Sequence, residues 1–248
     1  MPVSTFASSA ATALRIASLD LCADEYALTF ARQQAIVSVS HLGANAKEFA
    51  LAARAGGIHR NDGSLASVAR LKPDLVLTSR PLSSGGTRLA RRLGIRVYAI
   101  PYASTPVDVR RQVESIGSLI GSGAAARRWI ARFDRLAKTR PAARRALFLG
   151  PTGTDVGPLN RGWFALAGID PFALPPGRSR IEQIARLRPD VIVESDYRAG
   201  DWHRGSDWKT HRLVADLRAT RYTIDGRAMN CGGPAMLDAV AALKAQRG

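Results

Sequence analysis

The chain has 248 residues, 46% of them apolar, with two cysteines and a formal net charge of +16 at pH 7. This length provides a sizeable core in one large domain or two small ones. Two cysteines exclude a disulfide framework but allow a single bridge, and no stretch approaches the roughly 20 apolar residues of a membrane-spanning helix. The positive charge favours nucleic acid, an anionic membrane surface or an anionic ligand as a partner, although a solvated basic surface explains it equally well.

Residues 1–14 form an uncharged N-terminal segment of mostly small side chains that contains the Ala-x-Ala pattern Ala11–Thr12–Ala13. The segment resembles the end of a secretory signal, but it does not show the basic start and the apolar middle of such a signal. We expect either a trimmed signal or a flexible N-terminus.

Residues 15–104 alternate between predicted strands and helices, which is typical of a parallel sheet. The predicted strands are Arg15–Leu19, Ala35–Ser40, Asp74–Thr78 and Ile95–Ile100, and the predicted helices are Asp24 to about Gln33, Ala44–Ala55, a short one at 65–71 and Thr87–Leu93. The turn at 20–23 lies between the first strand and the first helix. Ligands gather at such turns in open α/β sheets, so we expect this end of the sheet to face a ligand.

Residues 105–143 contain two long predicted helices and no predicted strand. The helices are Thr105–Gly121 and Ala124–Thr139, and the span 123–145 carries eight Lys or Arg residues against Asp134 alone. We expect this helical connector to be a stiff strut rather than a flexible linker.

Residues 144–248 return to the alternation of strands and helices. The predicted strands are Ala146–Gly150, Asp190–Glu194 and Tyr222–Ile224, and the predicted helices are Leu159–Ala167, a short one at 181–187, one ending at Leu217 and Met236–Ala245. A loop of sequence MNCGGP at 229–234 precedes the last helix. The pattern predicts a second α/β half.

One stretch occurs in both halves. Residues 64–79 read SLASVARLKPDLVLTS, and residues 180–195 read RIEQIARLRPDVIVES, 116 positions later. In each copy a short amphipathic helix is followed by a proline, which disfavours further helix, and then by an apolar strand. The separation is too long for a solenoid repeat and fits two similar lobes. The predicted fold class is therefore α/β, with two Rossmann-like lobes built on central parallel sheets, a long helical strut that joins them and a ligand cleft between them.

The motifs of common catalytic and metal sites are not met. The loop GPTGTDVG at 150–157 follows a strand but lacks the closing Gly-Lys-Ser/Thr of a phosphate-binding loop. His41, His59, His203 and His211 do not pair at a zinc-ligand spacing, and there is neither a GxSxG motif nor a nucleic-acid-binding motif. We therefore expect no enzyme activity, no resident metal or cofactor and no nucleic-acid partner.

The two cysteines lie at predicted strand-to-helix turns, Cys22 in the first half and Cys231 in the second. Cys22 precedes a helix whose dipole would lower a thiol pKa, but it also suits a small buried residue in a tight turn. A bridge to Cys231 is a third interpretation, and it would tie the lobes together across the cleft.

Together these features resemble the class III periplasmic binding proteins, the substrate-binding components of ABC importers for vitamin B12, haem and ferric siderophores. The resemblance covers about residues 15–247. It is carried by the repeated helix-to-strand unit, by RIASLDLCADEYAL at 15–28 and by CGGP at 231–234, which is similar to the ending of a B12-binding-like subgroup. It implies a periplasmic monomer that binds cobalamin, haem or a ferric siderophore between its lobes and delivers it to a membrane permease dimer. The alternatives are an α/β enzyme and a non-secreted scaffold of the same fold that acts on another small anionic molecule.

We expect an N-terminal lobe at 15–104, a helical connector at 105–143 and a C-terminal lobe at 144–248. The resemblance implies that one Glu on each lobe pairs with arginines of the permease dimer. Glu182 occupies that position in the second lobe, whereas Ala66 occupies it in the first and cannot form the pair.

Candidate ligand contacts are the polar and aromatic residues near the ends of the predicted strands, where they would face the cleft. They are Cys22, His41, Arg60, Arg80, Tyr102, Thr152, Tyr197, Trp202, Met229 and Asn230. Haem binders of the family often use a Tyr or His axial ligand, which singles out Tyr197 and His41. The positive charge favours haem propionates or siderophore carboxylates, whereas B12-type binding needs mostly aromatic packing.

Overall fold

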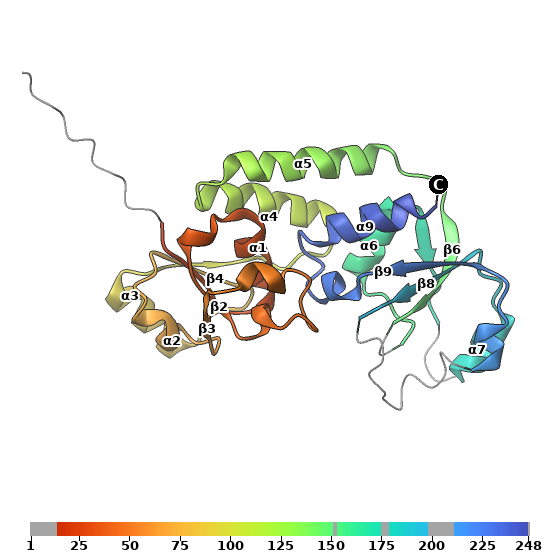
Figure 1. The fold of residues 1–248 in the computed structure, drawn as a ribbon, viewed down its shortest axis with the longest axis horizontal. Helices are drawn as coiled ribbons and strands as arrows, with labels where there is room; N and C mark the ends of the chain where they lie inside the picture. Colours follow the sequence, from red (N-terminus) through yellow and green to blue (C-terminus); the bar gives the residue numbers. More distant parts are fainter. Residues whose placement is uncertain (1–13, 151–152, 175–178, 198–210, 248) are drawn as a thin grey trace, which may run out of the picture.

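The computed structural model describes residues 14–150, 153–174, 179–197 and 211–247. These residues form two halves, each with its own sheet, and a pair of long helices joins the halves along one edge of the molecule (Figure 1). The fold class predicted from the sequence is confirmed.

The N-terminal sheet has the strand order β3-β2-β1-β4-β5, with neighbouring strands parallel. Side chains of successive residues in β1 face opposite sides of the sheet. Ile16 packs with residues of α1, and Ala17 packs with residues of α2 and α3. Both faces are therefore covered, which explains why every residue of β1 and β4 is buried. The elements are β1 (Ile16–Ser18), α1 (Leu21–Phe30), β2 (Ile36–Ser40), β3 (His59–Asn61), α2 (Leu65–Ala69), β4 (Leu75–Thr78), α3 (Ser84–Leu93) and β5 (Arg96–Ala99).

The connector consists of α4 (Pro106–Leu119) and α5 (Gly123–Lys138). A capping box that begins at Thr105 satisfies the first turn of α4. A Cβ atom on Gly117 would lie 2.4 Å from the Cβ of Ala126, so this glycine is needed where the two helices touch. The predicted pair of helices is confirmed, and its close packing explains how the connector acts as a strut.

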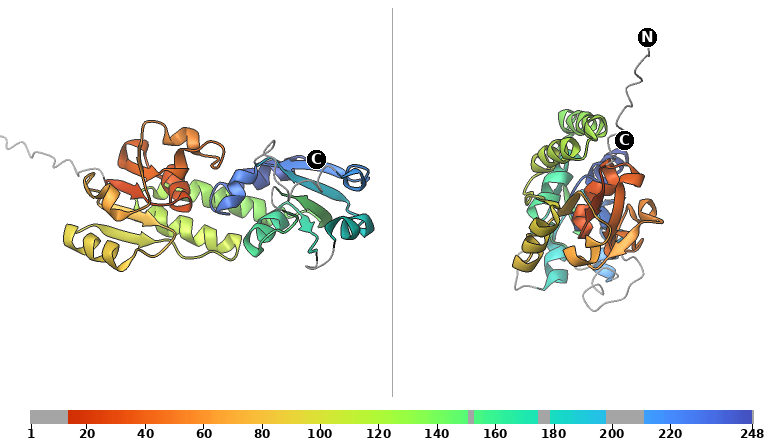
Figure 2. Two further views of the ribbon diagram at one scale, coloured as in Figure 1. Left: turned by 90° about the horizontal axis from the view of Figure 1, so that it is seen from below. Right: turned by 90° about the vertical axis from the view of Figure 1, so that its left-hand side faces the viewer.

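The C-terminal sheet has the order β7-β6-β8-β9, again with parallel neighbours. The connector is anchored to this half by three aromatic rings. Trp129 and Phe133 of α5 stack with their centroids 5.6 Å apart, and both meet Trp163 of α6 edge-on. One cluster of buried side chains continues from here through the connector into the N-terminal half, and Figure 2 shows α4 and α5 spanning both halves. The elements are β6 (Arg144–Leu149), α6 (Pro158–Leu166), β7 (Ile169–Pro171), α7 (Arg180–Arg186), β8 (Val191–Ser195), α8 (Arg212–Ala215), β9 (Thr220–Ile224) and α9 (Met236–Ala245).

The repeated sequence builds the same unit in each half, α2 with β4 and α7 with β8. The aspartate of each repeated unit forms the first hydrogen bonds between its strand and the neighbouring strand. The carboxylate of Asp74 accepts the N–H of Arg15 at 2.8 Å, while the N–H of Asp74 donates to the carbonyl of Arg15 at 2.8 Å. Asp190 forms the same two bonds with Arg145, at 2.9 and 3.0 Å. The repeated Pro-Asp pair therefore ends a helix and fixes the register of a sheet.

The predicted helix Ala44–Ala55 is wrong. The structure has two short 3-10 segments, Leu42–Ala44 and Ala52–Ala55, with turns between them. The backbone carbonyls of Ala46 and Glu48 accept hydrogen bonds at 2.9 Å from side chains of the C-terminal half. These carbonyls are used for contact between the halves rather than for a helix, which the sequence of this segment does not reveal.

Two further differences concern short elements. The first helix begins at Leu21 rather than at Asp24, so Cys22 lies in its first turn and not before it. The edge strands β3 and β7 were not predicted, because each is three residues long and neither has a continuous apolar pattern.

Candidate functional site

A pocket of about 240 Å³ lies where the N-terminal half, α4 and the C-terminal half meet. Its walls come from α1, from the segments that follow β4 and β5, from α4 and α6, and from the loop before α9. Among the lining residues are Cys22, Ser79, Tyr102, Gln112, Asn230 and Cys231. The carboxyl ends of β4 and β5 thus lead into a pocket shared with the second half.

Cys22 and Cys231 form a disulfide bond in one wall of this pocket, with their Cα atoms 5.3 Å apart. The bond joins the first turn of α1 to the loop before α9, so it ties the two halves together. Because both sulfur atoms are bonded to each other, Cys22 carries no free thiol in this structure.

The segment 231–235, which contains the CGGP sequence, is held from several sides. The indole N–H of Trp163 donates to the carbonyl of Gly232 at 2.7 Å, and that of Trp129 donates to the carbonyl of Pro234 at 3.1 Å. Gly232 has a φ of +63°, where a side chain would be strained. The CGGP sequence is therefore a rigid loop that both the connector and α6 hold against the pocket.

Glu25 of α1 is buried and reaches across to the same loop. Its carboxyl group accepts the N–H of Ala235 at 2.5 Å, and a Cβ atom on Gly233 would lie 2.9 Å from it. Burial raises the pKa of Glu25 from 4.5 to about 8, although the bond from Ala235 acts in the opposite direction. At neutral pH this side chain is therefore mostly protonated, and it joins the halves as an uncharged group.

A chain of hydrogen bonds positions the pocket wall. The hydroxyl of Tyr26 donates to the side-chain oxygen of Gln112 on α4, and the amide of Gln112 donates to the carbonyl of Pro101 at 2.7 Å. The next residue, Tyr102, has 86% of its surface exposed. Tyr102 hydrogen-bonds to none of the residues that the structure describes. The backbone at the pocket is thus fixed while the ring of Tyr102 stays available to a ligand.

A second contact between the halves involves the segment around Glu48. The hydroxyl of Tyr197 donates to the carboxylate of Glu48, and the side-chain amide of Asn230 donates to its carbonyl at 2.9 Å. Arg227 donates to the carbonyl of Ala46 at 2.9 Å. Tyr197 and Asn230, both predicted to bind a ligand, therefore help to hold the halves together, and of these two Asn230 also lines the pocket.

Three of the predicted contacts come together in the pocket, namely Cys22, Tyr102 and Asn230. The other described ones do not line it. His41 and Arg60 are exposed at β2 and β3, Arg80 lines a separate hollow in the N-terminal half, and Met229 is half-buried beside Asn230. Thr152 and Trp202 lie outside the described residues.

Sequence reasoning missed Tyr26, Gln112 and Leu159, which also line the pocket. All three lie on helices, whereas the prediction considered strand ends. One signal was available, since Gln112 is a polar residue among the apolar positions of its helix and is buried there.

The two positions that the resemblance links to permease docking are both exposed. Glu182 lies in the first turn of α7, and Ala66 lies in α2 beside a hollow of about 470 Å³. An exposed acid, Asp62, nevertheless lies just before α2. Its carboxylate accepts the N–H of Ser64 at 2.8 Å. Hydrogen bonds from Ser64 and Ser67 lower the pKa of Asp62, which keeps it ionised. Each half therefore presents one carboxylate at the start of its repeated helix.

The described part of the chain holds no group of three or more His, Cys, Asp or Glu side chains that could bind a metal ion. Within the same residues, none of the helices has the length and apolar character needed to cross a membrane.

Two lobes of parallel sheet, a pair of helices that joins them and a pocket between them define the fold of the class III periplasmic binding proteins. The resemblance to this class noted from the sequence is supported by solved structures, which match over nearly the whole chain. The chain matches no model of a protein family and no curated protein, so the likeness is one of structure.

The periplasmic haem-binding protein HutB of Vibrio cholerae has a TM-score of 0.70 at 18% identity, with 95% of this chain and 99% of that chain covered. The periplasmic haem-binding protein RhuT of Roseiflexus has a TM-score of 0.63 at 17% identity, with 94% and 97% covered. The periplasmic vitamin B12-binding protein BtuF of Vibrio cholerae has a TM-score of 0.58 at 20% identity, with 93% and 95% covered. At these identities the structures establish the fold.

Proposed function

We propose that this protein is the periplasmic substrate-binding component of an ABC importer. It captures a metal chelate or a corrinoid, such as haem, cobalamin or a ferric siderophore, between its lobes and delivers it to a membrane permease. The observation that carries the proposal is the pocket between the halves, which combines a fixed wall with one exposed aromatic ring. The solved structures named for haem and vitamin B12 binding, which share the fold, support the same class of ligand.

The chemistry of the pocket suits a flat and partly apolar ligand. Tyr102 offers a ring face for stacking and a phenol oxygen for iron or a hydrogen bond, while Gln112 and Asn230 supply polar groups at fixed positions. At about 240 Å³ the pocket is smaller than the roughly 300–1,000 Å³ of sites that enclose a whole drug-sized ligand. A macrocycle held there would bury one edge and leave the rest at the mouth of the pocket.

Tyr102 replaces Tyr197 and His41 as the residue that we expect to meet the ligand first. Tyr197 is engaged with Glu48, and His41 does not line the pocket. The net charge of +16 favours ligands with carboxylates, such as haem propionates.

Titration of the purified protein with haemin, cobalamin and ferric siderophores, followed by absorbance and tryptophan quenching, tests the proposal. We expect saturable binding of at least one of them, and at least tenfold weaker binding by Tyr102→Ala. The matched control is Leu93→Ala, which removes an apolar side chain that is 50% exposed on α3 and does not line the pocket. If none of the three compounds binds, or if both variants lose the same affinity, the proposal is wrong.

Delivery to the permease would use the carboxylates at the starts of the two repeated helices. Glu182 supplies one, and Asp62 supplies the other in place of the expected glutamate at Ala66. Exposed carboxylates pair well with arginines of a partner, because charge-assisted bonds orient a complex. The permease face would thus include α2 and α7.

A further inference from the structure

The outward face of α5 carries five exposed basic side chains, which we call the α5 stripe: Arg127, Arg128, Arg132, Arg135 and Lys138. At 3.6 residues per turn they fall within about 140° of the helix circumference and extend along about 17 Å of its length. The opposite side of the helix carries the buried residues Ala126, Trp129 and Phe133. The stripe is therefore one continuous basic face, set by the same periodicity that packs the connector.

The charge of the stripe is largely uncompensated. Asp134 also lies on α5, but Arg110 of α4 binds its carboxylate with a closest distance of 2.9 Å. Of the stripe, Arg132 pairs with Asp238 of α9. The other four have no ion-pair partner among the residues that the structure describes, which leaves about four positive charges side by side. Like charges on one helix face repel each other, so this face is suited to an anionic surface outside the chain.

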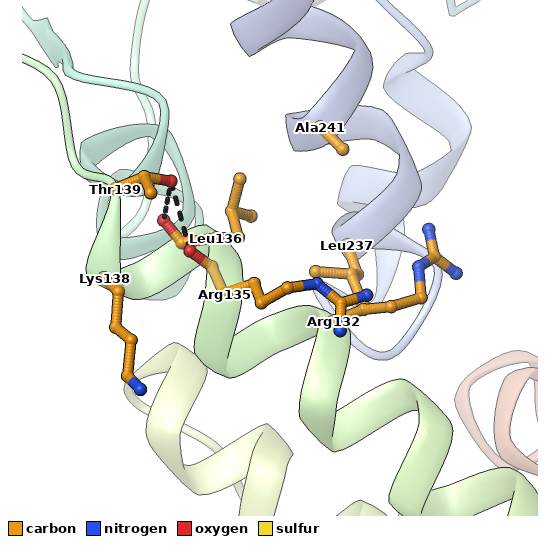
Figure 3. Close-up of a pocket in the computed structure, with 7 residues that line it drawn as sticks. All are labelled: Arg132, Arg135, Leu136, Lys138, Thr139, Leu237 and Ala241. Carbon is orange, nitrogen blue, oxygen red and sulfur yellow. Dashed lines mark hydrogen bonds between the residues drawn. The ribbon is translucent and has the colours of Figure 1, made fainter.

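An apolar groove of about 350 Å³ runs beside the stripe, between α5 and α9. Leu136, Leu237 and Ala241 line it with apolar atoms, and Arg132 and Arg135 extend from α5 toward α9 next to them (Figure 3). A basic rim above an apolar groove matches an amphiphile that has a phosphate head and an acyl chain. A soluble polyanion would use the rim but not the groove.

We propose that the α5 stripe and its groove dock on a bilayer that contains anionic phospholipids. α5 lies along one long edge of the molecule, while α2 and α7 lie along the other (Figure 1). A protein adsorbed through α5 therefore turns α2 and α7 away from that bilayer. Adsorption and docking through α2 and α7 thus use opposite sides of the protein. This proposal does not depend on the identity of the ligand.

Co-sedimentation with vesicles tests the proposal. The wild-type protein is expected to bind vesicles of phosphatidylcholine with one quarter phosphatidylglycerol in 50 mM salt, and to bind pure phosphatidylcholine vesicles far more weakly. Each cation near an anionic surface contributes about fivefold to binding, so Arg127→Gln combined with Arg128→Gln and Arg135→Gln should weaken it about 100-fold. Raising the salt should weaken wild-type binding, because the charges are exposed.

The matched control removes the same three charges from another exposed helix, α3, with Arg88→Gln, Arg91→Gln and Arg92→Gln. It should keep vesicle binding within about threefold of wild type, and circular dichroism should show both variants folded. Equal losses in the two variants would mean that only net charge matters and would overturn the proposal. It is also overturned if the wild type does not distinguish the two vesicles, or if inorganic polyphosphate or poly-L-glutamate binds the stripe as tightly as the vesicles do. The ligand titration is a separate measurement, so either proposal can fail while the other stands.

Discussion

Replacing Glu25 by glutamine should remove a large pH dependence of stability between about pH 4.5 and pH 8. Glu25 has 1% of its surface exposed, and burial raises its pKa from 4.5 to about 8. Glutamine has nearly the same shape, and its side-chain oxygen can still accept the N–H of Ala235 across the interface between the halves. The substitution therefore removes the titration while preserving the contact.

The direction in which stability changes with pH follows from proton binding. Between about pH 4.5 and pH 8 the folded protein keeps a proton on Glu25 that the unfolded chain loses. The stability that this group contributes is therefore complete below pH 4.5 and is lost as the pH rises to 8. A shift from 4.5 to about 8 corresponds to at most about 5 kcal/mol, since one pKa unit equals about 1.4 kcal/mol. Glu25→Gln should become more stable than wild type as the pH rises, and close to it at pH 4.5.

Urea unfolding at pH 4 to 9 and constant ionic strength measures this difference in the free energy of unfolding. Glu114→Gln is the control, because its carboxylate is 67% exposed on α4 and should change the free energy of unfolding little at any pH. In the Glu25 variant the free energy of unfolding should still change with pH between about pH 4 and 6, because burial raises the pKa of Asp24 to about 6. Parallel curves for wild type and Glu25→Gln over the whole range would refute the reasoning.

Two other predictions concern the disulfide that joins the halves and the carboxylates of the proposed docking face. Replacing both Cys22 and Cys231 by serine should lower the free energy of unfolding by at most about 5 kcal/mol, because the bond closes a loop with a sequence separation of 209 residues. Reduced wild type should match this variant in urea unfolding, and an unchanged midpoint in both would contradict the prediction. Glu182→Arg or Asp62→Arg should abolish uptake of whichever of haemin, cobalamin and the ferric siderophores binds, while the dissociation constant for that ligand stays within twofold. Uptake at the wild-type rate in both variants would exclude these carboxylates from docking.

The parts of the fold that could be predicted are those in which local pattern and tertiary role agree. The repeated unit is an example, since its helix period, its proline and its apolar strand all belong to one element. The helix predicted at 44–55 shows the opposite case. Its apolar residues fit a helix, but the carbonyls of Ala46 and Glu48 bond to the other half. Contacts between segments about 180 residues apart leave no signal in the local sequence.

The site was predictable to the extent that strand ends define it. Cys22 and Tyr102 were found in this way, whereas His41 and Arg60 satisfied the same rule and do not line the pocket. The end of a parallel sheet is an edge of several strands, and the sequence does not say which of them face the second lobe. In this protein β4 and β5 do so, because α4 follows β5 directly and contacts both α1 and α6.

The disulfide and the hydrogen bonds at the pocket limit how the halves can move. The segment 231–235 is bonded to α1 through the disulfide, accepts hydrogen bonds from Trp129 and Trp163 through its carbonyls and donates to the buried carboxyl of Glu25. Separating the halves at this wall would break a covalent bond or expose these groups, so wide opening is not available for ligand entry. On the proposed function, the ligand therefore enters and leaves at the mouth beside Tyr102, without separation of the halves at this wall.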